Sequence, residues 1–161
     1  MDQHEYYLSH NYEGLINCAD HGRWGFINRE GSFVIPPQYS YCHPFFEGLA
    51  AVRLKEKEEF IFIDRQNNVV IEKPFEGADL RFSEGLCAVW RRKGGFGFID
   101  RTGRLVITYT FYFAGHFAEG LVVVWESKSA GYGFVDRSGV KGIPARFTSL
   151  MPTLLKEVWP R

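Results

Sequence analysis

The chain has 161 residues, enough for a domain with a sizeable core, and its 19 Lys and Arg balance 19 Asp and Glu. Nucleic-acid binders usually carry a basic excess, because neutralising phosphates supplies their affinity, so zero net charge argues against a nucleic-acid partner. The N-terminal residues lack the basic and apolar segments of a signal peptide, and no apolar run is long enough to cross a bilayer. Three cysteines without metal-type spacing fit a reducing compartment. We therefore expect a cytoplasmic protein without a membrane partner.

Four copies of a unit of about 36 residues follow one another along the chain. Glu-Gly-Leu occurs in each copy, and 11 to 13 residues later comes an aromatic residue that begins a block resembling Gly-Phe-Ile-Asp-Arg. The predicted parts are an N-terminal extension (1–12), copies over 13–46, 47–83, 84–118 and 119–150, and a tail (151–161). The repeat positions to which we assign a structural role are Gly14, Gly48, Gly85 and Gly120 in the tripeptides, and the aromatic residues Trp24, Phe60, Phe96 and Tyr132.

Each copy is predicted to form three strands, in the same order. The first strand follows Glu-Gly-Leu, over residues 15–20, 49–54, 86–91 and 121–126; the second carries the aromatic block; the third carries a Val-Ile pattern at 33–35, 69–71 and 105–107. The fourth copy keeps only Ile143 of that pattern, so we expect its third strand to be lost. The tail after residue 150 is expected to form a short turn that covers the last copy.

The turn between the second and third strands has a fixed length, which predicts a fixed geometry. In Asp100-Arg101-Thr102-Gly103 the Asp side chain can accept backbone NH groups, and the Gly suits the left-handed residue of a G1-bulge hairpin. The second copy has Asn67 in place of that glycine, and Asn is the next best residue at positive φ. The sequence therefore predicts one backbone shape in all four turns.

These elements predict an all-β fold of four tandem three-stranded hairpin repeats. A single copy cannot bury its apolar faces, so neighbouring copies must stack on one another. Three strands in about 36 residues favour an open twisted array, because a propeller blade usually has four strands and about 40 or more residues. A propeller-like closed arrangement is the alternative.

The combined pattern resembles the WG-repeat family, also called KWG repeats. The resemblance rests on residues 22–31, 33–39 and 47–52, and it extends over most of the chain, from about Glu13 to Phe147. The literal Trp-Gly pair stands only at Trp24-Gly25, and the second copy has Phe60-Ile61 instead. The resemblance implies a bacterial type of binding or scaffolding protein without a general catalytic activity.

Two sets of residues are candidates for binding. Trp90 and Trp125 share one repeat position, and strand alternation favours buried packing for both; an exposed Trp beside Arg91 and Arg92 would instead make a good interface anchor. An arginine recurs every 36 residues in the turn that follows the second strand. It is either a ladder for an anionic partner or a solvated turn residue. The members of this second set are Arg65 and Arg101, with Arg29 and Arg137 at the same position.

No combination of residues predicts catalysis, a cofactor or a metal site. Cys42 and His43 are adjacent, so on a strand they point to opposite faces and do not form a nucleophile–base pair. The preferred hypothesis is a non-catalytic module that binds a protein partner, one form of which would be an immunity or inhibitor protein against a cognate effector. A glycan- or ligand-binding module using surface aromatic residues is the alternative, and a hydrolase with an assembled site comes last. The sequence leaves the oligomeric state open.

Overall fold

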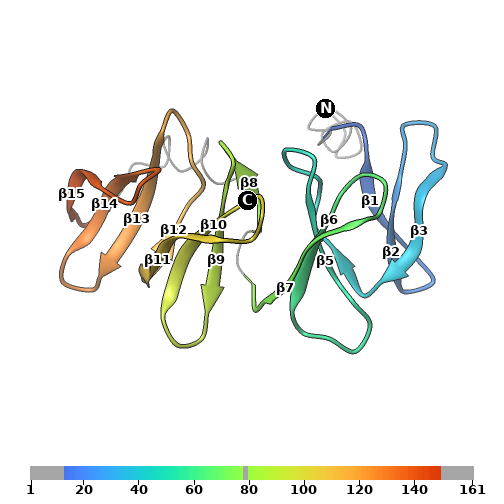
Figure 1. The fold of residues 1–161 in the computed structure, drawn as a ribbon, viewed down its shortest axis with the longest axis horizontal. Helices are drawn as coiled ribbons and strands as arrows, with labels where there is room; N and C mark the ends of the chain where they lie inside the picture. The colour runs from blue at the N-terminus through green and yellow to red at the C-terminus, as the bar shows by residue number, and fades with distance from the viewer. Residues whose placement is uncertain (1–12, 78–79, 150–161) are drawn as a thin grey trace. The chain divides into compact units, whose positions relative to one another are not determined.

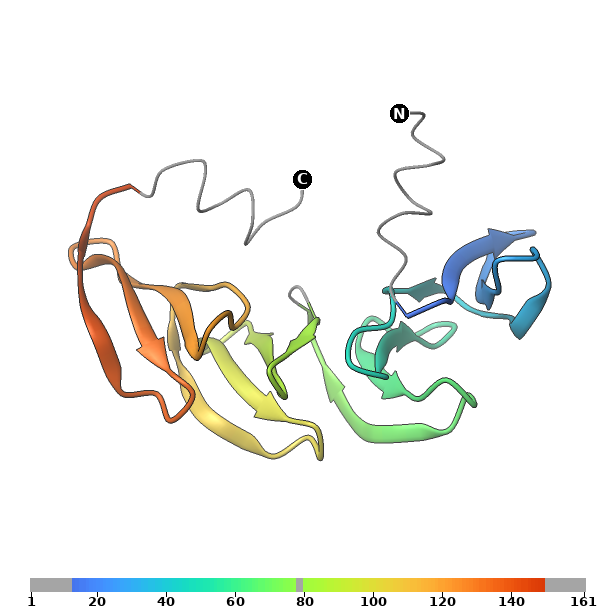
Figure 2. The ribbon, with the colours of Figure 1, turned by 90° about the horizontal axis from the view of Figure 1, so that it is seen from above.

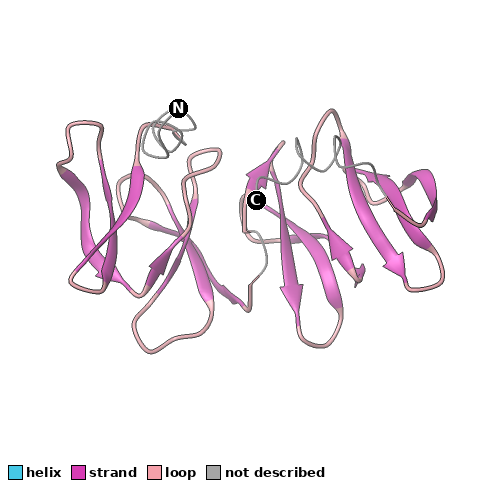
Figure 3. Ribbon diagram, turned by 180° about the vertical axis from the view of Figure 1, so that it is seen from behind, coloured by secondary structure: helices cyan, strands magenta, loops and turns pink. Residues whose placement is uncertain are grey.

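The computed structural model describes residues 13–77 and 80–149, and within these ranges the chain forms strands and no helix (Figures 1 and 3). The all-β prediction is therefore confirmed, and none of the described sheets closes into a barrel. Two compact units divide the chain, Met1–Pro74 and Phe75–Arg161. The predicted N-terminal extension and the predicted tail lie outside the described residues.

The first two sheets are antiparallel and lie almost wholly in the first unit, with β7 ending at the unit boundary. The first sheet has the order β1-β2-β3, with β1 at Ile16–Asp20, β2 at Arg23–Ile27 and β3 at Phe33–Tyr39. The second has the order β4-β5-β6-β7, with β4 at Tyr41–Cys42, β5 at Ala50–Arg53, β6 at Phe60–Ile63 and β7 at Val69–Phe75.

The second unit repeats the four-stranded arrangement twice. Its first sheet contains β8 (Phe82–Ser83), β9 (Leu86–Arg91), β10 (Gly95–Asp100) and β11 (Leu105–Phe111). Its second sheet contains β12 (Phe113–Ala114), β13 (Leu121–Ser127), β14 (Gly131–Asp136) and β15 (Lys141–Phe147). The three predicted strands are thus present in every copy, and the last three sheets gain a two-residue strand that precedes the Glu-Gly turn.

The expected loss of the third strand in the fourth copy is wrong, because β15 is formed and pairs with β14. The reason lies in which side chains of this strand are buried. Val34, Val70 and Val106 are exposed, whereas the isoleucine that follows each of them is buried. The fourth copy lacks the valine but keeps Ile143, the residue that faces the sheet interior in the other copies.

The Asp-Arg turns have the predicted geometry. In the third copy the NH of Gly103 donates to the carbonyl of Asp100 (2.9 Å), and the Asp100 carboxylate accepts the backbone NH groups of Thr102 (2.9 Å) and Arg104 (3.1 Å). Gly103 has φ +82° and Asn67, its counterpart in the second copy, has φ +67°. Gly31 and Gly139 are also at positive φ, so one turn shape recurs four times as predicted.

The Glu-Gly pairs form tight two-residue turns in which both residues have positive φ. Glu is an unusual choice for a left-handed position, and its side chain supplies the compensation. The Glu13 carboxylate accepts the backbone NH of Gly48 at 2.8 and 3.0 Å. Glu84 does the same for Gly120 at 2.9 and 3.3 Å. Within each unit, a carboxylate of one copy therefore binds the turn of the next.

In each unit a core lies between its two sheets. In the first unit Leu15, Phe26, Ile35 and Tyr39 of the first sheet pack on Cys42, Phe45, Ala50, Val52 and Ile63 of the second. In the second unit Leu86, Ala88, Phe98, Ile107 and Phe111 pack on Ala114, Phe117, Val122, Val124 and Val135, and the two sheets lie side by side (Figure 2). Each sheet thus has a forward face, which carries the Phe of the aromatic block, and a backward face. No described helix has the length and apolarity needed to span a membrane.

Candidate functional site

One end of every sheet carries an aromatic row. The repeat aromatic residue of the second strand pairs directly with the last residues of the first strand, beside the hairpin loop. These cross-strand pairs are Trp24 with Ala19, Phe60 with Arg53, Phe96 with Trp90, and Tyr132 with Trp125. The candidate residues Trp90 and Trp125 therefore lie at the loop end of their sheets.

The loops at this end differ from copy to copy, whereas the turns at the opposite end do not. The loops between the first and second strands span residues 21–22, 54–59, 92–94 and 128–130. The opposite end carries the Glu-Gly and Asp-Arg turns, which share their geometry among copies. In repeat proteins, binding is usually carried by segments that vary on a constant scaffold. The loop end is therefore where a site is expected.

Both candidate tryptophans are half-buried. Trp125 stacks on Tyr132, with ring centroids 5.5 Å apart and an interplanar angle of 24°, and Tyr112 lies 6.3 Å away with 60% of its surface exposed. Trp90 is held by a backbone bond from its NH to the carbonyl of Gly77 (3.0 Å). The rings contribute to packing and still reach the surface.

The neighbouring arginines are exposed and partly engaged within the second unit. The Arg91 guanidinium lies 4.6 Å from the ring centroid of Tyr109, which is cation–π distance. Burial raises the pKa of the Tyr109 hydroxyl, with the positive charge of Arg91 acting in the opposite direction. The backbone NH of Arg92 donates to Glu76 (3.0 Å). Trp90, Arg91 and Arg92 thus occupy one region, with Arg91 laid against a ring.

The turn arginines lie at the other end of the sheets, so the structure does not bring the two candidate sets together. Arg65 and Arg101 are exposed, as are Arg29 and Arg137. The Arg65 guanidinium lies beside Gly14, and that of Arg137 lies beside Gly85. Each of these two side chains therefore packs against the Glu-Gly turn of the preceding copy, which gives it a role inside the repeat array.

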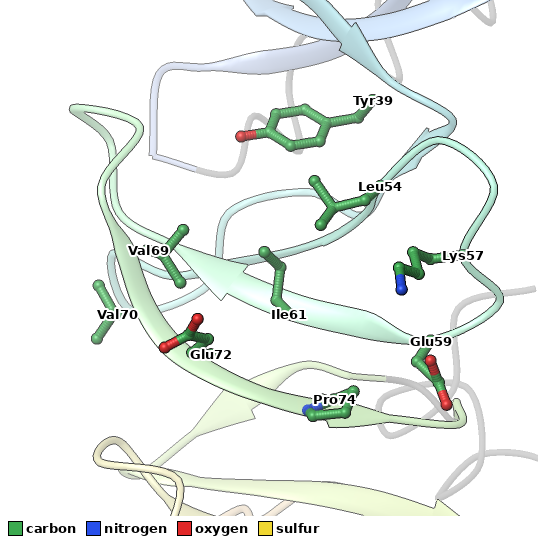
Figure 4. Close-up of a pocket in the computed structure, with 9 residues that line it drawn as sticks. All are labelled: Tyr39, Leu54, Lys57, Glu59, Ile61, Val69, Val70, Glu72 and Pro74. Atoms are coloured by element: carbon green, nitrogen blue, oxygen red, sulfur yellow. The ribbon is translucent and has the colours of Figure 1, made fainter.

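The second copy contains a groove that sequence reasoning missed. Its volume is about 650 Å³, and it is lined by Tyr39, Leu54, Lys57, Glu59, Ile61, Val69, Val70, Glu72 and Pro74 (Figure 4). We call this site the Ile61 groove. Apolar side chains of Leu54, Ile61 and Val69 line it, and three charged residues stand around them (Figure 4). The six-residue loop 54–59, the longest of the four loops, contributes several of the lining residues.

The groove occurs where the second copy departs from the repeat. The other copies have glycine at the position of Ile61, and there the third strand passes so close that no side chain fits. A Cβ on Gly25 would lie 2.4 Å from the carbonyl oxygen of Ile35, and one on Gly97 would lie 2.7 Å from that of Ile107. Ile61 projects instead into the space beside β7 (Figure 4). A single substitution in the repeat thus marks the groove.

A second difference from the repeat pattern, the pair Tyr39 and Asn67, supports one wall of the Ile61 groove. The hydroxyl of Tyr39, a buried residue of β3, donates to the side-chain oxygen of Asn67 at 2.6 Å. Tyr39 stands where later copies have Phe75, Phe111 and Phe147, and Asn67 stands where the others have glycine. Burial raises the pKa of Tyr39, so this phenol remains a donor at neutral pH. The pair fixes a ring of the first sheet to a turn of the second.

The charged residues of the groove are available to a ligand. The side chains of Lys57, Glu59 and Glu72 are exposed, and within residues 13–77 and 80–149 none of them makes a hydrogen bond or ion pair. The lone Ile in the glycine position and the long charged loop were both visible in the sequence. The groove that they form together could not be predicted, because it depends on how β7 passes Ile61.

Groups suited to chemistry are dispersed. The Nδ1 atom of His21 lies 2.8 Å from Asp20, but the two side chains are 93% and 53% exposed at a loop tip outside the groove. Burial, with a smaller contribution from Cys18, raises the pKa of the Cys42 thiol to about 12, so this cysteine is protonated at neutral pH. The described part of the chain holds no group of three His, Cys, Asp or Glu residues placed to bind a metal.

Comparison with protein families gives a match to a repeat family. The model of the WG containing repeat matches residues 24–57, 62–89 and 96–124, which together make up more than half of the chain. Each matched stretch runs from or near an aromatic block into the following copy. No curated protein matches the chain.

Proposed function

The chain belongs to the WG-repeat family, and from that premise we propose that it is a non-catalytic module that binds a partner protein through the Ile61 groove. The observation that carries the proposal is the replacement of the strand glycine by Ile61, which lines an apolar groove with a charged rim to which the variable loop 54–59 contributes. The match to the repeat family supports a scaffold that presents surfaces. The groove supplies a surface to which Ile61, a residue that departs from the repeat, contributes.

The groove has the composition of an interface anchor site. Its volume of about 650 Å³ falls inside the range of roughly 300–1,000 Å³ typical of ligand sites. Binding energy at protein interfaces concentrates where an apolar or aromatic side chain fills a pocket, while surrounding charges set orientation and partner choice. Leu54, Ile61 and Val69 would receive such a side chain, and the charged rim would align the segment that carries it.

Two acidic residues and one lysine define the charge preference of the rim. Glu59 and Glu72 outnumber Lys57, so a segment with a basic residue next to its apolar anchor is favoured. Such a partner would place the basic group near a glutamate and leave Lys57 free to meet an acidic or carbonyl group. An inhibitor that blocks a cognate effector would be one form of this complex.

The glycan alternative relies on the aromatic row at the loop end. A sugar stacks on a free ring face, and Trp125 has one face taken by Tyr132. Trp90 remains half-exposed beside exposed arginines. We therefore favour the protein partner and treat glycan binding as an outcome of the same experiment.

A phage library of random linear peptides, selected against the full chain, tests the proposal. We expect enriched peptides to share an apolar residue with a basic neighbour, and to bind Ile61→Gly about tenfold more weakly, which corresponds to the loss of one buried apolar contact. Ile61→Gly restores the repeat residue. The matched control Val34→Gly removes an exposed strand side chain outside the groove and should leave affinity unchanged.

Two results would count against the proposal. Peptides that bind Ile61→Gly and the parent chain equally would place the contact elsewhere. A glycan array that returns a ligand whose binding is lost in Trp90→Ala but kept in Ile61→Gly would replace the protein partner by a sugar.

A further inference from the structure

The loop end of the third copy concentrates positive charge in a chain whose net charge is zero. Arg91 ends β9, Arg92 and Lys93 follow it in the loop, and all three residues are exposed. The loop is held in place by the backbone NH of Arg92, which donates to the Glu76 carboxylate at 3.0 Å. Within the part of the chain that the structure describes, none of the three basic side chains forms an ion pair. Their charge is therefore available to a partner.

Arg91 occupies the repeat position of Leu54, a residue that lines the Ile61 groove. Across its hairpin Arg91 pairs with Gly95, and strand alternation places both on the backward face of the sheet, the face of Gly97. Gly97 is the repeat position of Ile61. The same face of the repeat thus carries an apolar residue in the second copy and a cation in the third.

The acidic residues of the groove are also exchanged in the third copy. Glu59 and Glu72 have Gly95 and Thr108 as their counterparts, and neither counterpart is charged. The charge preference of this face is therefore reversed between the two copies.

Tyr109 positions the guanidinium of Arg91. The guanidinium lies 4.6 Å from the ring centroid, and a Cβ on Gly94 would lie only 3.1 Å from the Cβ of Tyr109, so the loop lies directly against this residue. A guanidinium held on a ring loses less freedom when it binds a carboxylate. The other copies lack both members of this pair, with Asp20 and Pro37, Leu54 and Lys73, and Glu126 and Ala145 at the two positions. We call Arg91, Arg92, Lys93 and Tyr109 the Arg91 surface.

The outer edge of the sheet beside Tyr109 suits an extended segment. β11 is the outer strand, and its register with β10 leaves residues 108–110 without a paired residue in β10, as in a bulge. Every other third strand has a proline among the three residues that follow its isoleucine, namely Pro36, Pro74 or Pro144, whereas β11 has Thr-Tyr-Thr there. Proline removes a backbone NH donor, so this edge keeps donors that the other edges lack.

We propose that the Arg91 surface binds an extended acidic segment of a partner protein, with a carboxylate on Arg91 and the segment's backbone along the bulge of β11. This site is separate from the Ile61 groove and goes beyond the function proposed for it. Arginine suits a carboxylate because its planar guanidinium can donate two parallel hydrogen bonds. A short acidic peptide fits three basic residues better than a polyanion does, since phosphate binders depend on an overall basic excess that this chain lacks.

A phage library of random linear peptides, selected against the full chain carrying Ile61→Gly, tests the site with the groove altered. We expect enriched peptides to contain Asp or Glu and to bind about tenfold more weakly when Arg91→Glu is added, which places the residue of the fourth copy at this position. Lys128→Glu makes the same change of charge in an exposed loop of the fourth copy and should leave affinity unchanged. Equal urea midpoints check that both variants remain folded.

The support given by the ring is tested separately. Tyr109→Phe keeps the ring and should bind as before, whereas Tyr109→Ala should bind about threefold more weakly because Arg91 is no longer held.

Two results would overturn the proposal. Equal weakening by Arg91→Glu and Lys128→Glu would show that only overall charge matters. A ten-nucleotide single-stranded RNA that binds in an Arg91-dependent way, with no acidic peptide enriched, would assign the surface to a polyanion. Either result leaves the Ile61 groove untested, because the selection uses the chain in which that groove is altered.

Discussion

The second and third copies share one plan of strands and turns and differ at two of its glycine positions. The third copy has Gly97, against which the backbone of β11 packs closely, and Gly103 in the turn. The second copy has Ile61 and Asn67 at these positions. Ile61 lines the groove, and Asn67 accepts the hydroxyl of Tyr39, another groove residue. Both residues that replace a repeat glycine are therefore linked to the Ile61 groove.

The comparison shows how a repeat gains a groove without losing its framework. The Asp-Arg turn keeps its hydrogen bonds in both copies, with the carboxylate of Asp64 or Asp100 accepting backbone NH groups from the residues two and four positions later. Positive φ is tolerated by Asn, so the turn survives the exchange of Gly for Asn67. What changes is the space beside the second strand, where a side chain takes the place of close backbone contact.

The largest expected effect is on stability at the strand glycine of the third copy. In Gly97→Ala the new Cβ would lie 2.7 Å from the oxygen of Ile107 and 3.1 Å from the nitrogen of Tyr109, and neither backbone atom can rotate away. We expect a loss of about 2–3 kcal/mol in the free energy of unfolding, as for other overpacked interiors. Urea denaturation followed by fluorescence measures it.

The matched variant in the second copy is Ile61→Ala, which removes a half-buried side chain and adds no clash. Its expected cost is about 1 kcal/mol, the loss of partial apolar burial. If Gly97→Ala is no more destabilising than Ile61→Ala, close packing of β11 does not require a glycine at position 97. The proposed difference between the second and third copies would then be wrong.

The next effect concerns the turn of the second copy. Asn67→Gly relieves a left-handed non-glycine residue, which favours the variant by roughly 0.5–1 kcal/mol. It also leaves the buried Tyr39 hydroxyl without its acceptor, which costs about 1–3 kcal/mol. We expect a net loss of about 1 kcal/mol in the free energy of unfolding, measured by urea denaturation.

A double-mutant cycle with Tyr39→Phe separates these two contributions. In the Tyr39→Phe background the hydroxyl is gone, so Asn67→Gly should be neutral or slightly stabilising. If Asn67→Gly destabilises both backgrounds equally, the role of Asn67 is confined to its own turn and the link to the groove is broken.

The sequence predicted those parts of the fold that are determined by residues close together in the chain. Alternating apolar residues and the Asp-Arg-x-Gly turns each depend on a few adjacent positions, and both are confirmed. The two-residue strands β4, β8 and β12 are too short to show any periodicity. Their pairing depends on the Glu-Gly turn, in which Glu is not a residue that turn preferences would select.

The candidate site was harder to predict because its residues meet through contacts between copies. Tyr39 and Asn67 are 28 positions apart, and the Glu13 carboxylate reaches Gly48 across 35 positions. The hairpin register places the loop-end tryptophans and the turn arginines at opposite ends of their sheets. Predicting this separation requires knowing where each strand begins. Ile61 was visible as a departure from Trp-Gly, but only the path of β7 shows that this departure opens a groove.

The smallest expected effect tests whether the two copies are equal at their turns. Hydrogen bonds from Asn68 lower the pKa of Asp64, and those from Thr102 lower the pKa of Asp100, below the ordinary value near 3.8. The folded pKa is thus below the unfolded one, so each carboxylate stabilises the fold above about pH 4, and this contribution is lost as the pH falls through the folded pKa.

Asp64→Asn and Asp100→Asn should therefore flatten the decline of the urea midpoint between neutral pH and pH 3, since Asn28 shows that an amide can occupy this turn position without titrating. Both effects should be small, because these carboxylates are close to solvent and screened by it. The effect of Asp64→Asn should not exceed that of Asp100→Asn, because the two turns share their backbone bonds and Asp100 also accepts the Arg104 side chain at 3.2 Å. A clearly larger effect of Asp64→Asn would mean that the turn beside the groove is coupled to it, and that the second copy departs from the third in its framework as well as in its surface.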